Sequence, residues 1–534
     1  MSNKSKKIRN ARIIATDIFM FVAVIAIVFL MMLVAMGFKF NDEGNLEQSG
    51  LLQLTSIPGS AKVTIDGNEL LMPTKINKLL SIGEHDVKVT KTGYDTWNST
   101  IKIDSGLLTE INWVRLFPLN PKTSDVDTFA TAPTLVSASN SRKYMLVAEE
   151  NNDHFDLLSL QEEKIKSTSI AFSDFISIAP NEDGSTTPAK ASEFNVVAWN
   201  NNDNKILMKY SRNNEINWVL VNAAKPKESL NLTSIYNKKF VQVLFENDSA
   251  TKAWALSGDE LYQLDLSNKS ITGPIATKVQ KIANNGDVVA YIATSDEVLI
   301  DDTKTIDSEV AVDDDTTANK IFIYKDGEES ATIVADLGST EASSMLEMGT
   351  HWSSNWLAYN IGAKMYIRSG VYPSYNKNSL EDFQIKYEKD ISHAPVATDK
   401  NVDQRIIMLA ESNKVTAFDL ETKAMYSYET DGIISDFTWL DNYMLWQQKD
   451  TKLVVWDFDG NNHREIVQKL YGNYPTMISA NNKYLYYFTS EDIATEAKPN
   501  TAETQAESDG TVQAEVAPIT SKQIYHLTRM ELQQ

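Results

Sequence analysis

The chain begins with a long apolar segment at residues 18–38, which contains no charged side chain until Lys39 follows it. Five basic residues precede the segment: Lys4, Lys6, Lys7, Arg9 and Arg12. As an α-helix at about 1.5 Å per residue it reaches roughly 30 Å, the thickness of a bilayer core. Basic residues beside a span stay on the cytoplasmic side. The pattern therefore predicts a basic cytoplasmic tail at 1–12, a single-pass transmembrane anchor at 13–38 and extracytoplasmic domains beyond it.

A cleavable signal peptide is the alternative interpretation of the same segment. Ala35 and Gly37 place small residues at a spacing that signal peptidases accept. Against cleavage, the apolar run is longer than the roughly 7–15 residues of a signal peptide's apolar region. An acylated lipoprotein is excluded, because the chain contains no cysteine. We therefore expect an uncleaved anchor and keep cleavage as the second possibility.

The pattern then changes to short alternating strands. Residues 39–49 are polar and without periodicity, which predicts a short tether. From residue 50 onward, alternating apolar and polar positions predict strands at 51–56, 61–65, 84–90, 97–103 and 110–116. Asp66-Gly67 between two of them is typical of a tight hairpin. Residues 50–118 are therefore predicted to form a small all-β module.

This module resembles the PEGA domain, a small β-sandwich of prokaryotic surface proteins. The naming motif stands as residues 58–61 (PGSA), which match at proline and alanine but not between them. Further matches are residues 63–67 (VTIDG), 83–89 (GEHDVKV) and 91–94 (KTGY). The resemblance implies a surface spacer or interaction module, and it brings no catalytic residues.

After a predicted linker at 119–133, an apolar strand that ends in a small polar residue recurs along the chain. Eight copies end at Ser159, Asn222, Asp265, Asp326, Ser369, Asp419, Asp457 and Thr528. Most copies follow a second apolar strand, and neighbouring units lie as little as 38 residues apart, from Asp419 to Asp457. Units of about 40 residues with several strands are typical of propeller blades. Residues 134–534 are thus predicted to form a seven- or eight-bladed β-propeller.

The propeller region resembles WD40-like or quinoprotein-like propellers. Residues 454–460 (VVWDFDG), followed by Arg464, resemble the blade motif of the TolB family in one blade. Three inserts interrupt the repeat, at 296–316, 371–392 and 491–519. The last is poor in large apolar side chains, so we expect a long loop inside the final blade, and residues 523–530 to form a closing strand. The predicted fold class is therefore all-β: one transmembrane helix, a PEGA-like sandwich and a propeller.

Charge restricts the possible partners. The chain has 534 residues with a formal net charge of −22, although its first twelve residues are basic. Such an acidic exterior repels phosphates, which argues against nucleic-acid binding. The absence of cysteine also excludes disulfides and thiolate metal sites.

Catalytic motifs are not found in the sequence. It contains none of the phosphate-binding, zinc-protease or serine-elbow patterns, and its six histidines are scattered singly. The acidic run at 301–315 and the turn 457–460 are conceivable calcium ligands, but neither has the full ligand pattern of a calcium loop. We therefore expect no metal site, no cofactor and no enzymatic activity.

One insert carries aromatic side chains that are suited to contact. Tyr372, Tyr375, Phe383 and Tyr387 lie within 371–392, and aromatic residues on a loop offer rigid apolar area. They form the predicted partner-contact loop. The expected function is a non-enzymatic, membrane-anchored surface protein whose propeller binds an envelope polysaccharide or a protein. The alternatives are an extracytoplasmic propeller enzyme acting on glycans and an envelope assembly or sensor component. The oligomeric state is left open.

Overall fold

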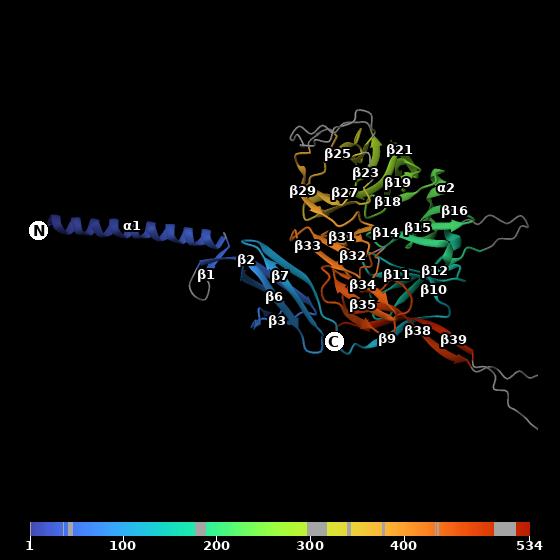
Figure 1. Ribbon diagram of the computed structural model, residues 1–534, viewed down its shortest axis with the longest axis horizontal. Helices are drawn as coiled ribbons and strands as arrows, with labels where there is room; N and C mark the ends of the chain where they lie inside the picture. Colours follow the sequence, from blue (N-terminus) through green and yellow to red (C-terminus); the bar gives the residue numbers. More distant parts are fainter. Residues whose placement is uncertain are drawn as a thin grey trace, which may run out of the picture. The chain divides into compact units, whose positions relative to one another are not determined.

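The computed structural model contains two compact units, one that reaches Pro121 and one that spans Lys122–Leu532. Each unit is described by itself (Figure 1). The structure describes residues 2–35, 37–40, 46–176, 188–295, 318–338, 343–375, 380–432, 434, 437–495 and 520–533. The predicted inserts at 296–316 and, from residue 496, at 491–519 lie outside these ranges.

The first unit begins with the helix α1 (Ser2–Ala35). Its stretch Thr16–Leu33 has a mean hydropathy of 2.6, and none of it is buried within the protein. By length and composition this helix is able to cross a membrane. The predicted basic tail lies within the same helix from Ser2 onward.

The rest of the first unit is a sandwich of two four-stranded sheets. In one sheet β2 pairs with β1, β5 and β8; the other has the order β4-β3-β6-β7. The strands of the first sheet are β1 (Phe38–Phe40), β2 (Leu46–Ile57), β5 (Ile76–Ser81) and β8 (Leu108–Arg115). Those of the second are β3 (Lys62–Ile65), β4 (Asn68–Glu69), β6 (Gly83–Thr90) and β7 (Thr96–Ile103). The prediction of a tether at 39–49 is corrected, because β1 and the start of β2 pair through Lys39 and Glu47.

The hairpin between β3 and β4 has the predicted turn. Asp66 and Gly67 both have positive φ, at 50° and 80°, as a two-residue turn of this twist requires. The Asp66 carboxylate also lies 2.6 Å from Nδ1 of His85, whose Nε2 is 2.9 Å from the carbonyl oxygen of Ser81. This contact lowers the pKa of Asp66. His85 thus joins the hairpin to the end of β5, which is a structural role.

The second unit is a β-propeller of eight sheets that follow one another in chain order. The first four sheets each have four antiparallel strands. They are β10 (Pro133–Ala138), β11 (Tyr144–Glu149), β12 (His154–Ser159), β13 (Lys166–Ala171); β14 (Phe194–Trp199), β15 (Lys205–Arg212), β16 (Glu215–Asn222), β17 (Leu230–Asn231); β18 (Gln242–Phe245), β19 (Lys252–Ser257), β20 (Glu260–Asp265), β21 (Ser270–Ala276); and β22 (Val279–Asn285), β23 (Val288–Ser295), β24 (Ala318–Lys325), β25 (Thr332–Gly338). A short helix, α2 (Leu232–Tyr236), follows β17.

The last four sheets contain one exception to the four-stranded pattern, since the seventh has three strands. They are β26 (Leu346–His351), β27 (Ser354–Ile361), β28 (Lys364–Gly370), β29 (Phe383–Asp390); β30 (Ala397–Lys400), β31 (Ile406–Glu411), β32 (Lys414–Asp419), β33 (Met425–Glu429); β34 (Met444–Lys449), β35 (Lys452–Asp457), β36 (Arg464–Val467); and β37 (Met477–Ile478), β38 (Tyr484–Thr495), β39 (Thr520–Glu531) with β9 (Thr123–Phe129). The predicted blade count of seven or eight is therefore resolved as eight.

The sheets pack face to face, so their middle strands are apolar on both sides. In β11, Leu146 and Ala148 belong to a core shared with the second sheet. The alternate residues Met145 and Val147 belong to a core shared with the eighth sheet. Successive side chains of a strand point to opposite faces, so a strand buried on both faces becomes a continuous apolar run. This is the pattern by which the repeat is visible in the sequence.

The ring is closed by a strand from the start of the unit. β9 pairs antiparallel with β39, from Tyr525 opposite Phe129 to Met530 opposite Thr123. In Figure 1 the red C-terminal strand accordingly lies beside the teal β9. The predicted linker at 119–133 is corrected, because residues 123–129 are the outermost strand of the last sheet. The expected closing strand at 523–530 lies within β39.

Two predicted inserts are shorter than expected. Residues 383–390 of the predicted insert 371–392 form β29, the fourth strand of the fifth sheet. Residues 491–495 of the predicted insert 491–519 continue β38. Both predictions were wrong for the same reason. An outer or protruding strand is only partly covered by neighbours, so it carries many polar side chains and resembles a loop in the sequence.

Hydrogen bonds between the first hairpins of neighbouring sheets run around the whole ring. The first hairpin of each sheet is hydrogen-bonded to that of the preceding sheet and to that of the following sheet. They are Asn140 Nδ2 to Trp199 O, Asn200 Nδ2 to Asp248 O, Asn284 Nδ2 to Phe245 O, Asn285 Nδ2 to Thr350 Oγ1, Thr350 N to Gln404 Oε1, Asn401 Nδ2 to Asn442 O, Ile478 N to Leu440 O and Ala480 N to Arg142 O. Each contributes roughly 0.5–1.5 kcal/mol.

A buried ion pair fixes one of the strand ends that recur in the sequence. Arg405 and Asp419 have side chains 4% and 0% exposed, and they bond bidentately at 2.8 and 2.7 Å. Asp419 also accepts from the backbone N–H of Glu421 and the hydroxyl of Thr422. The end of β32 and the turn after it therefore depend on one carboxylate.

We expect Asp419→Ala to lower the free energy of unfolding by about 3–5 kcal/mol, because it leaves the Arg405 guanidinium buried without its carboxylate. Chemical denaturation of the full chain in detergent measures this. As a control, Glu162→Ala breaks an exposed pair with Lys166 and should cost less than about 1 kcal/mol. Equal losses for the two variants would contradict the importance of the buried pair.

Candidate functional site

The four aromatic residues of the predicted contact loop have different surroundings. Phe383 is fully buried, and the buried hydroxyl of Tyr372 lies 3.1 and 3.0 Å from the carbonyl oxygens of Gly349 and Trp356. Tyr387 is half-buried and packs on Phe418. Tyr375 alone is exposed, at 38%. Local packing thus accounts for three of the four, and the contact prediction is left to Tyr375.

A more exposed aromatic residue lies beside this loop and was not singled out in the sequence. Trp352 is 76% exposed at the turn between β26 and β27. Its φ is +55°, in the left-handed region that favours glycine and costs a bulky residue roughly 1–2 kcal/mol. An exposed tryptophan in a strained turn is a feature that folding does not require, and strain of this kind concentrates at functional sites.

A single carboxylate holds this tryptophan in place. Glu421 accepts from the Trp352 indole N–H at 2.5 Å, and the same oxygen lies 2.9 Å from Nε2 of His351. The backbone N–H of Glu421 in turn donates to Asp419, the carboxylate paired with Arg405. Trp352 is therefore oriented through a chain of contacts that ends in the core of the sixth sheet.

Three further exposed side chains lie on connections at the same end of the fifth and sixth sheets as the Trp352 turn. Val371 and Tyr375 belong to the loop after β28. The Tyr372 hydroxyl in this loop donates to the carbonyl oxygen of Gly349 on β26. Tyr375 lies on the side of the fourth sheet, since its backbone N–H donates to Glu328. Val402 lies in the turn between β30 and β31, where Gln404 Oε1 accepts from the backbone N–H of Thr350. Val371 is 65% and Val402 59% exposed. We name these four residues, Trp352, Val371, Tyr375 and Val402, the Trp352 surface.

Two exposed carboxylates lie on the same connections as the Trp352 surface. Asp403 follows Val402 in its turn, and Asp382 closes the loop that begins at Val371, where its carbonyl accepts from the Val371 N–H. Both side chains are exposed and give this end of the two sheets an acidic border. The Asp403 carboxylate also accepts from Asn442 Nδ2 and from the Tyr443 hydroxyl, just before β34. Such a border favours a partner that is basic around an apolar contact.

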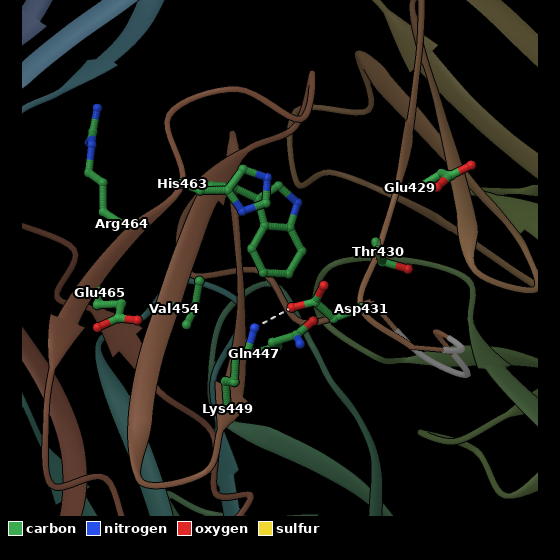
Figure 2. A pocket seen from close by; sticks show the side chains of 10 residues that line it. Glu429, Thr430, Asp431, Gln447, Lys449, Val454, His463, Arg464 and Glu465 are labelled. Atoms are coloured by element: carbon green, nitrogen blue, oxygen red, sulfur yellow. Dashed lines mark hydrogen bonds and ion pairs between the residues drawn. The ribbon is translucent and has the colours of Figure 1, made fainter.

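A second candidate is a groove between the sixth and seventh sheets, formed by two adjoining cavities of about 320 and 460 Å³. Asp431, Gln447 and Trp456 line both. Figure 2 shows Glu429 and Thr430 on one side of the first cavity and Val454 and Glu465 on the other. We name it the blade 6–7 groove. Its lining combines amide, carboxylate and aromatic side chains.

An aromatic stack forms one wall of the blade 6–7 groove. The exposed ring of His463 lies parallel to the buried Trp456, with centroids 5.6 Å apart and 9° between their planes. The Trp456 indole N–H donates to the hydroxyl of Tyr428 at 3.1 Å, and burial raises the pKa of that phenol. The stack is thus supported from the sixth sheet.

Two carboxylates of the groove lining form ion pairs with lysines. Lys449 and Asp431 lie 2.5 Å apart across it (Figure 2), and Lys452 bonds Glu465 at 2.7 Å. The hydrogen bond from Lys449 lowers the pKa of Asp431, and that from Lys452 lowers the pKa of Glu465. Both carboxylates therefore stay ionised well below neutral pH.

The groove lies where the propeller pattern is weakest. In the seventh sheet the described residues at the place of the usual first strand, 434 and 437–440, form one bridge, Trp439 opposite Leu445, with Thr438 accepting from the backbone N–H of Trp446. Phe437 and Thr438 line the second cavity. These described residues form the wall of the groove on the side of the seventh sheet's first strand.

Charged residues also connect the first strands of three sheets. Glu347 on β26 accepts from the Thr398 hydroxyl on β30 at 3.0 Å. Burial lowers the pKa of two lysines, Lys281 and Lys400, and the negative charge of Glu347 opposes that shift. The Lys400 ammonium donates to the carbonyl of Met348. Within the described residues these groups satisfy one another, which is a structural arrangement.

Two acidic segments are weighed as calcium ligands from the sequence, and neither is predicted to bind metal. Asp457 bonds Asn462, and Asp459 accepts from the backbone and side chain of Asn461, as in a polar turn. No group of three metal-ligating side chains is found in the part of the chain that the structure describes. The acidic run at 301–315 lies outside that part.

A family model matches the first unit at residues 49–115, and its description is the PEGA domain. The matched residues run from within β2 to the end of β8 and include every strand of the sandwich except β1. Residues 49–115 are a PEGA domain. Its motif residues serve the fold, since Pro58 to Ala61 and Gly67 lie in turns. Among curated proteins, no match is found.

Solved structures similar to the chain are distant in sequence. AztD from Citrobacter koseri is 11% identical, with 71% of this chain and 90% of that chain covered and a TM-score of 0.35. The oligogalacturonate lyase from Vibrio parahaemolyticus is 9% identical, with 68% and 95% covered and a TM-score of 0.37. The Cps50 (Swd1) β-propeller domain from Myceliophteria thermophila is 6% identical, with 64% and 97% covered and a TM-score of 0.36. At these scores, no ligand or activity is carried over from the three proteins.

We expect a larger side chain at Gly460 to displace Tyr428, the residue that hydrogen-bonds Trp456 of the His463–Trp456 stack. A Cβ there would lie 2.5 Å from the ring of Tyr428, and Gly460 has a φ of +83°. Gly460→Ala should therefore lower the free energy of unfolding by about 1–3 kcal/mol. Gly432→Ala in the same groove is the control, because nothing lies within 4 Å of its added Cβ. A denaturation midpoint shifted equally by both variants would refute this account.

Proposed function

We propose that the chain is a non-enzymatic, membrane-anchored protein that binds a protein partner at the Trp352 surface of its propeller. In this proposal α1 spans the membrane with its basic end in the cytoplasm, and the PEGA domain and propeller lie outside. The observation that carries it is the exposed Trp352, held in a strained turn by Glu421. Tryptophan is enriched among the residues that dominate protein interfaces, and a pre-oriented ring loses little entropy on binding.

The surroundings favour a partner with an apolar centre and a basic border. Val371, Tyr375 and Val402 extend the apolar contact around Trp352, and Asp382 and Asp403 border it. The net charge of −22 adds a long-range preference in the same direction. Binding should therefore weaken as ionic strength rises, because salt screens the border charges more than the apolar contact.

A second candidate function is polysaccharide binding in the blade 6–7 groove. Gln447, Gln448 and Asn473 supply amide donors and acceptors, and His463 presents a ring edge beside them. The lining has three carboxylates, Glu429, Asp431 and Glu465, and two side chains that are cationic at neutral pH, Lys449 and Arg464. A neutral or amino-bearing glycan therefore suits it better than an acidic one. This candidate rests on lining chemistry alone.

The same groove gives less support to the alternative of a glycan-cleaving enzyme. A general acid in glycoside hydrolysis needs a carboxyl whose pKa is raised. Asp431 and Glu465 have lowered pKa values, because each is ion-paired with a lysine. Two of the carboxylates in the groove are therefore suited to hydrogen bonding and not to proton donation.

Substitution of Trp352 should separate binding from folding. We expect Trp352→Gly to keep the unfolding free energy within about 1 kcal/mol, because relief of the left-handed φ offsets the lost indole hydrogen bond. It should abolish saturable binding of a purified envelope protein first identified by crosslinking at Tyr375. Binding is measured on the full chain in nanodiscs, at low and at high salt.

Two controls make this test specific. Val197→Ala removes an exposed valine on the second sheet, away from the Trp352 surface, and should leave binding unchanged. Asp403→Asn should lower the association rate several-fold and reduce its salt dependence. Binding that survives Trp352→Gly at full strength would exclude the Trp352 surface as the contact.

The groove candidate is tested with defined glycans. If it is correct, full-length chain in nanodiscs binds a neutral β-glucan or chitosan oligosaccharide, and His463→Ala with Gln447→Ala reduces affinity at least about tenfold. Trp352→Gly then has no effect, and polygalacturonate does not bind. Release of shortened oligosaccharides without retention would instead identify an enzyme and overturn the proposal of a binding protein.

A further inference from the structure

The outer face of the first PEGA sheet carries a row of exposed leucines. Leu51 of β2 pairs with Leu79 of β5 on one side and with Leu108 of β8 on the other. The three side chains are 37%, 47% and 47% exposed. Leucines directly opposite one another on three adjacent strands form one continuous apolar strip.

The strip is limited to one row of the sheet. Two residues further along the same face, Gln53 pairs with Asn77 and with Glu110, so the next row is polar on all three strands. Rows on one face are about 6.8 Å apart, since a strand rises about 3.4 Å per residue. The face therefore changes from apolar to polar within one row.

The apolar row lies close to the exit of the anchor helix, separated from it on this face by the pair Ser49 and Ser81. Gly37 lies two residues after the end of α1, and its carbonyl accepts from the backbone N–H and the hydroxyl of Ser49 at 2.5 and 2.7 Å. Ser49 precedes Leu51 by two residues on β2. Its own carbonyl accepts from the N–H of Gly106, in the turn that leads into β8. The exit of α1 is thus fastened to the end of the sheet that bears the leucines.

The fastening leaves no room for larger residues. A Cβ on Gly37, which has a φ of +82°, would lie 2.7 Å from the Ser49 carbonyl oxygen and 2.8 Å from the backbone of Gly106. Two further apolar residues lie at the same end, Ile82 before β6 and Leu107 before β8, exposed by 42% and 58%. Five exposed apolar side chains therefore gather where the chain leaves α1: Leu51, Leu79, Ile82, Leu107 and Leu108.

We infer that these five residues, the anchor-side patch, insert into the headgroup–acyl boundary of the bilayer that α1 spans. The inference rests on the proposal that α1 is an uncleaved anchor. Apolar side chains at the boundary are stabilised in proportion to the area they bury, whereas the polar row with Gln53 and Glu110 stays in water. The PEGA domain is then seated on the membrane, which limits the directions in which the domain can tilt.

The experiment uses the absence of cysteine in the chain. Full-length protein with Leu79→Cys is labelled with an environment-sensitive fluorophore and reconstituted into phosphatidylcholine vesicles. Asn77→Cys is the matched control, on the same strand and face one row further from the anchor. We expect nitroxide lipids labelled near the headgroup to quench the label at position 79 at least about twofold more than at 77. The pair Leu108→Cys and Glu110→Cys repeats the comparison on β8.

Other outcomes overturn the inference. Equal, weak quenching at 79 and 77 in protein that stays with the vesicles means that the patch does not touch lipid. A disulfide between two copies of the Leu79→Cys protein, without quenching, assigns the patch to a dimer contact. Loss of the protein from the vesicles by cleavage of α1 shows instead that the anchor proposal fails. Vesicle flotation distinguishes that case before any quenching is measured.

Discussion

The propeller depends on the pairing of its last strand with its first. A sheet between two others is apolar on both faces, so none of the eight sheets can be left with an open side. The β39–β9 pair completes the eighth sheet, and the core around Met145, Tyr486 and Phe488 then joins that sheet to the first. Every other sheet is held by neighbours close in sequence. The β39–β9 pairing joins residues about 400 positions apart. The conformational entropy lost in closing so long a loop is offset only when all eight sheets have formed and packed.

The hydrogen bonds between neighbouring first hairpins carry this closure around the ring. Because Asn200, Asn401 and similar side chains bond the next sheet, each hairpin has its position set by the preceding one. The turn that bears Trp352 is fixed in this way, through Thr350 and Gln404 on one side and Glu421 on the other. A rigid ring thus supports a turn that is strained by itself.

The features that we associate with function are departures from the repeat. The Trp352 turn has a bulky residue where glycine is favoured, and the described residues of the seventh sheet form one bridge where its neighbours have a first strand. In the PEGA domain, the departure is a row of leucines on the solvent face of a sheet. At such positions the residue does not match the local structure that the rest of the repeat favours, and in natural proteins these mismatches are expected mainly at functional sites. Their distribution over the turns of the fifth and sixth sheets, one groove and the anchor exit suggests separate roles for the propeller and the PEGA domain.

The sequence by itself determined the elements whose signal is local. The apolar run of α1, the Asp66-Gly67 turn and the eight recurring strands are such elements. Seven of the eight are the third strand of their sheet, and the eighth, β35, is the second strand of the three that remain in the seventh sheet. They are visible because a strand covered on both faces must be apolar throughout. The apolar strand that precedes the copy ending at Asn222, residues 195–199, lies in β14, the first strand of its sheet.

Only the tertiary structure decided which residues of similar type are buried and which are exposed. Tyr372 and Phe383 were expected at a contact surface. Phe383 is fully buried and Tyr372 is half-buried, with its hydroxyl bonded to the fourth and fifth sheets, whereas Trp352 two turns earlier is open to solvent. Residues 123–129 have a polar, linker-like composition, and they are a strand because β39 lies beside them. The leucine row exists only in the register of three strands. Each of these depends on contacts between residues distant in the chain, and one-dimensional patterns do not record such contacts.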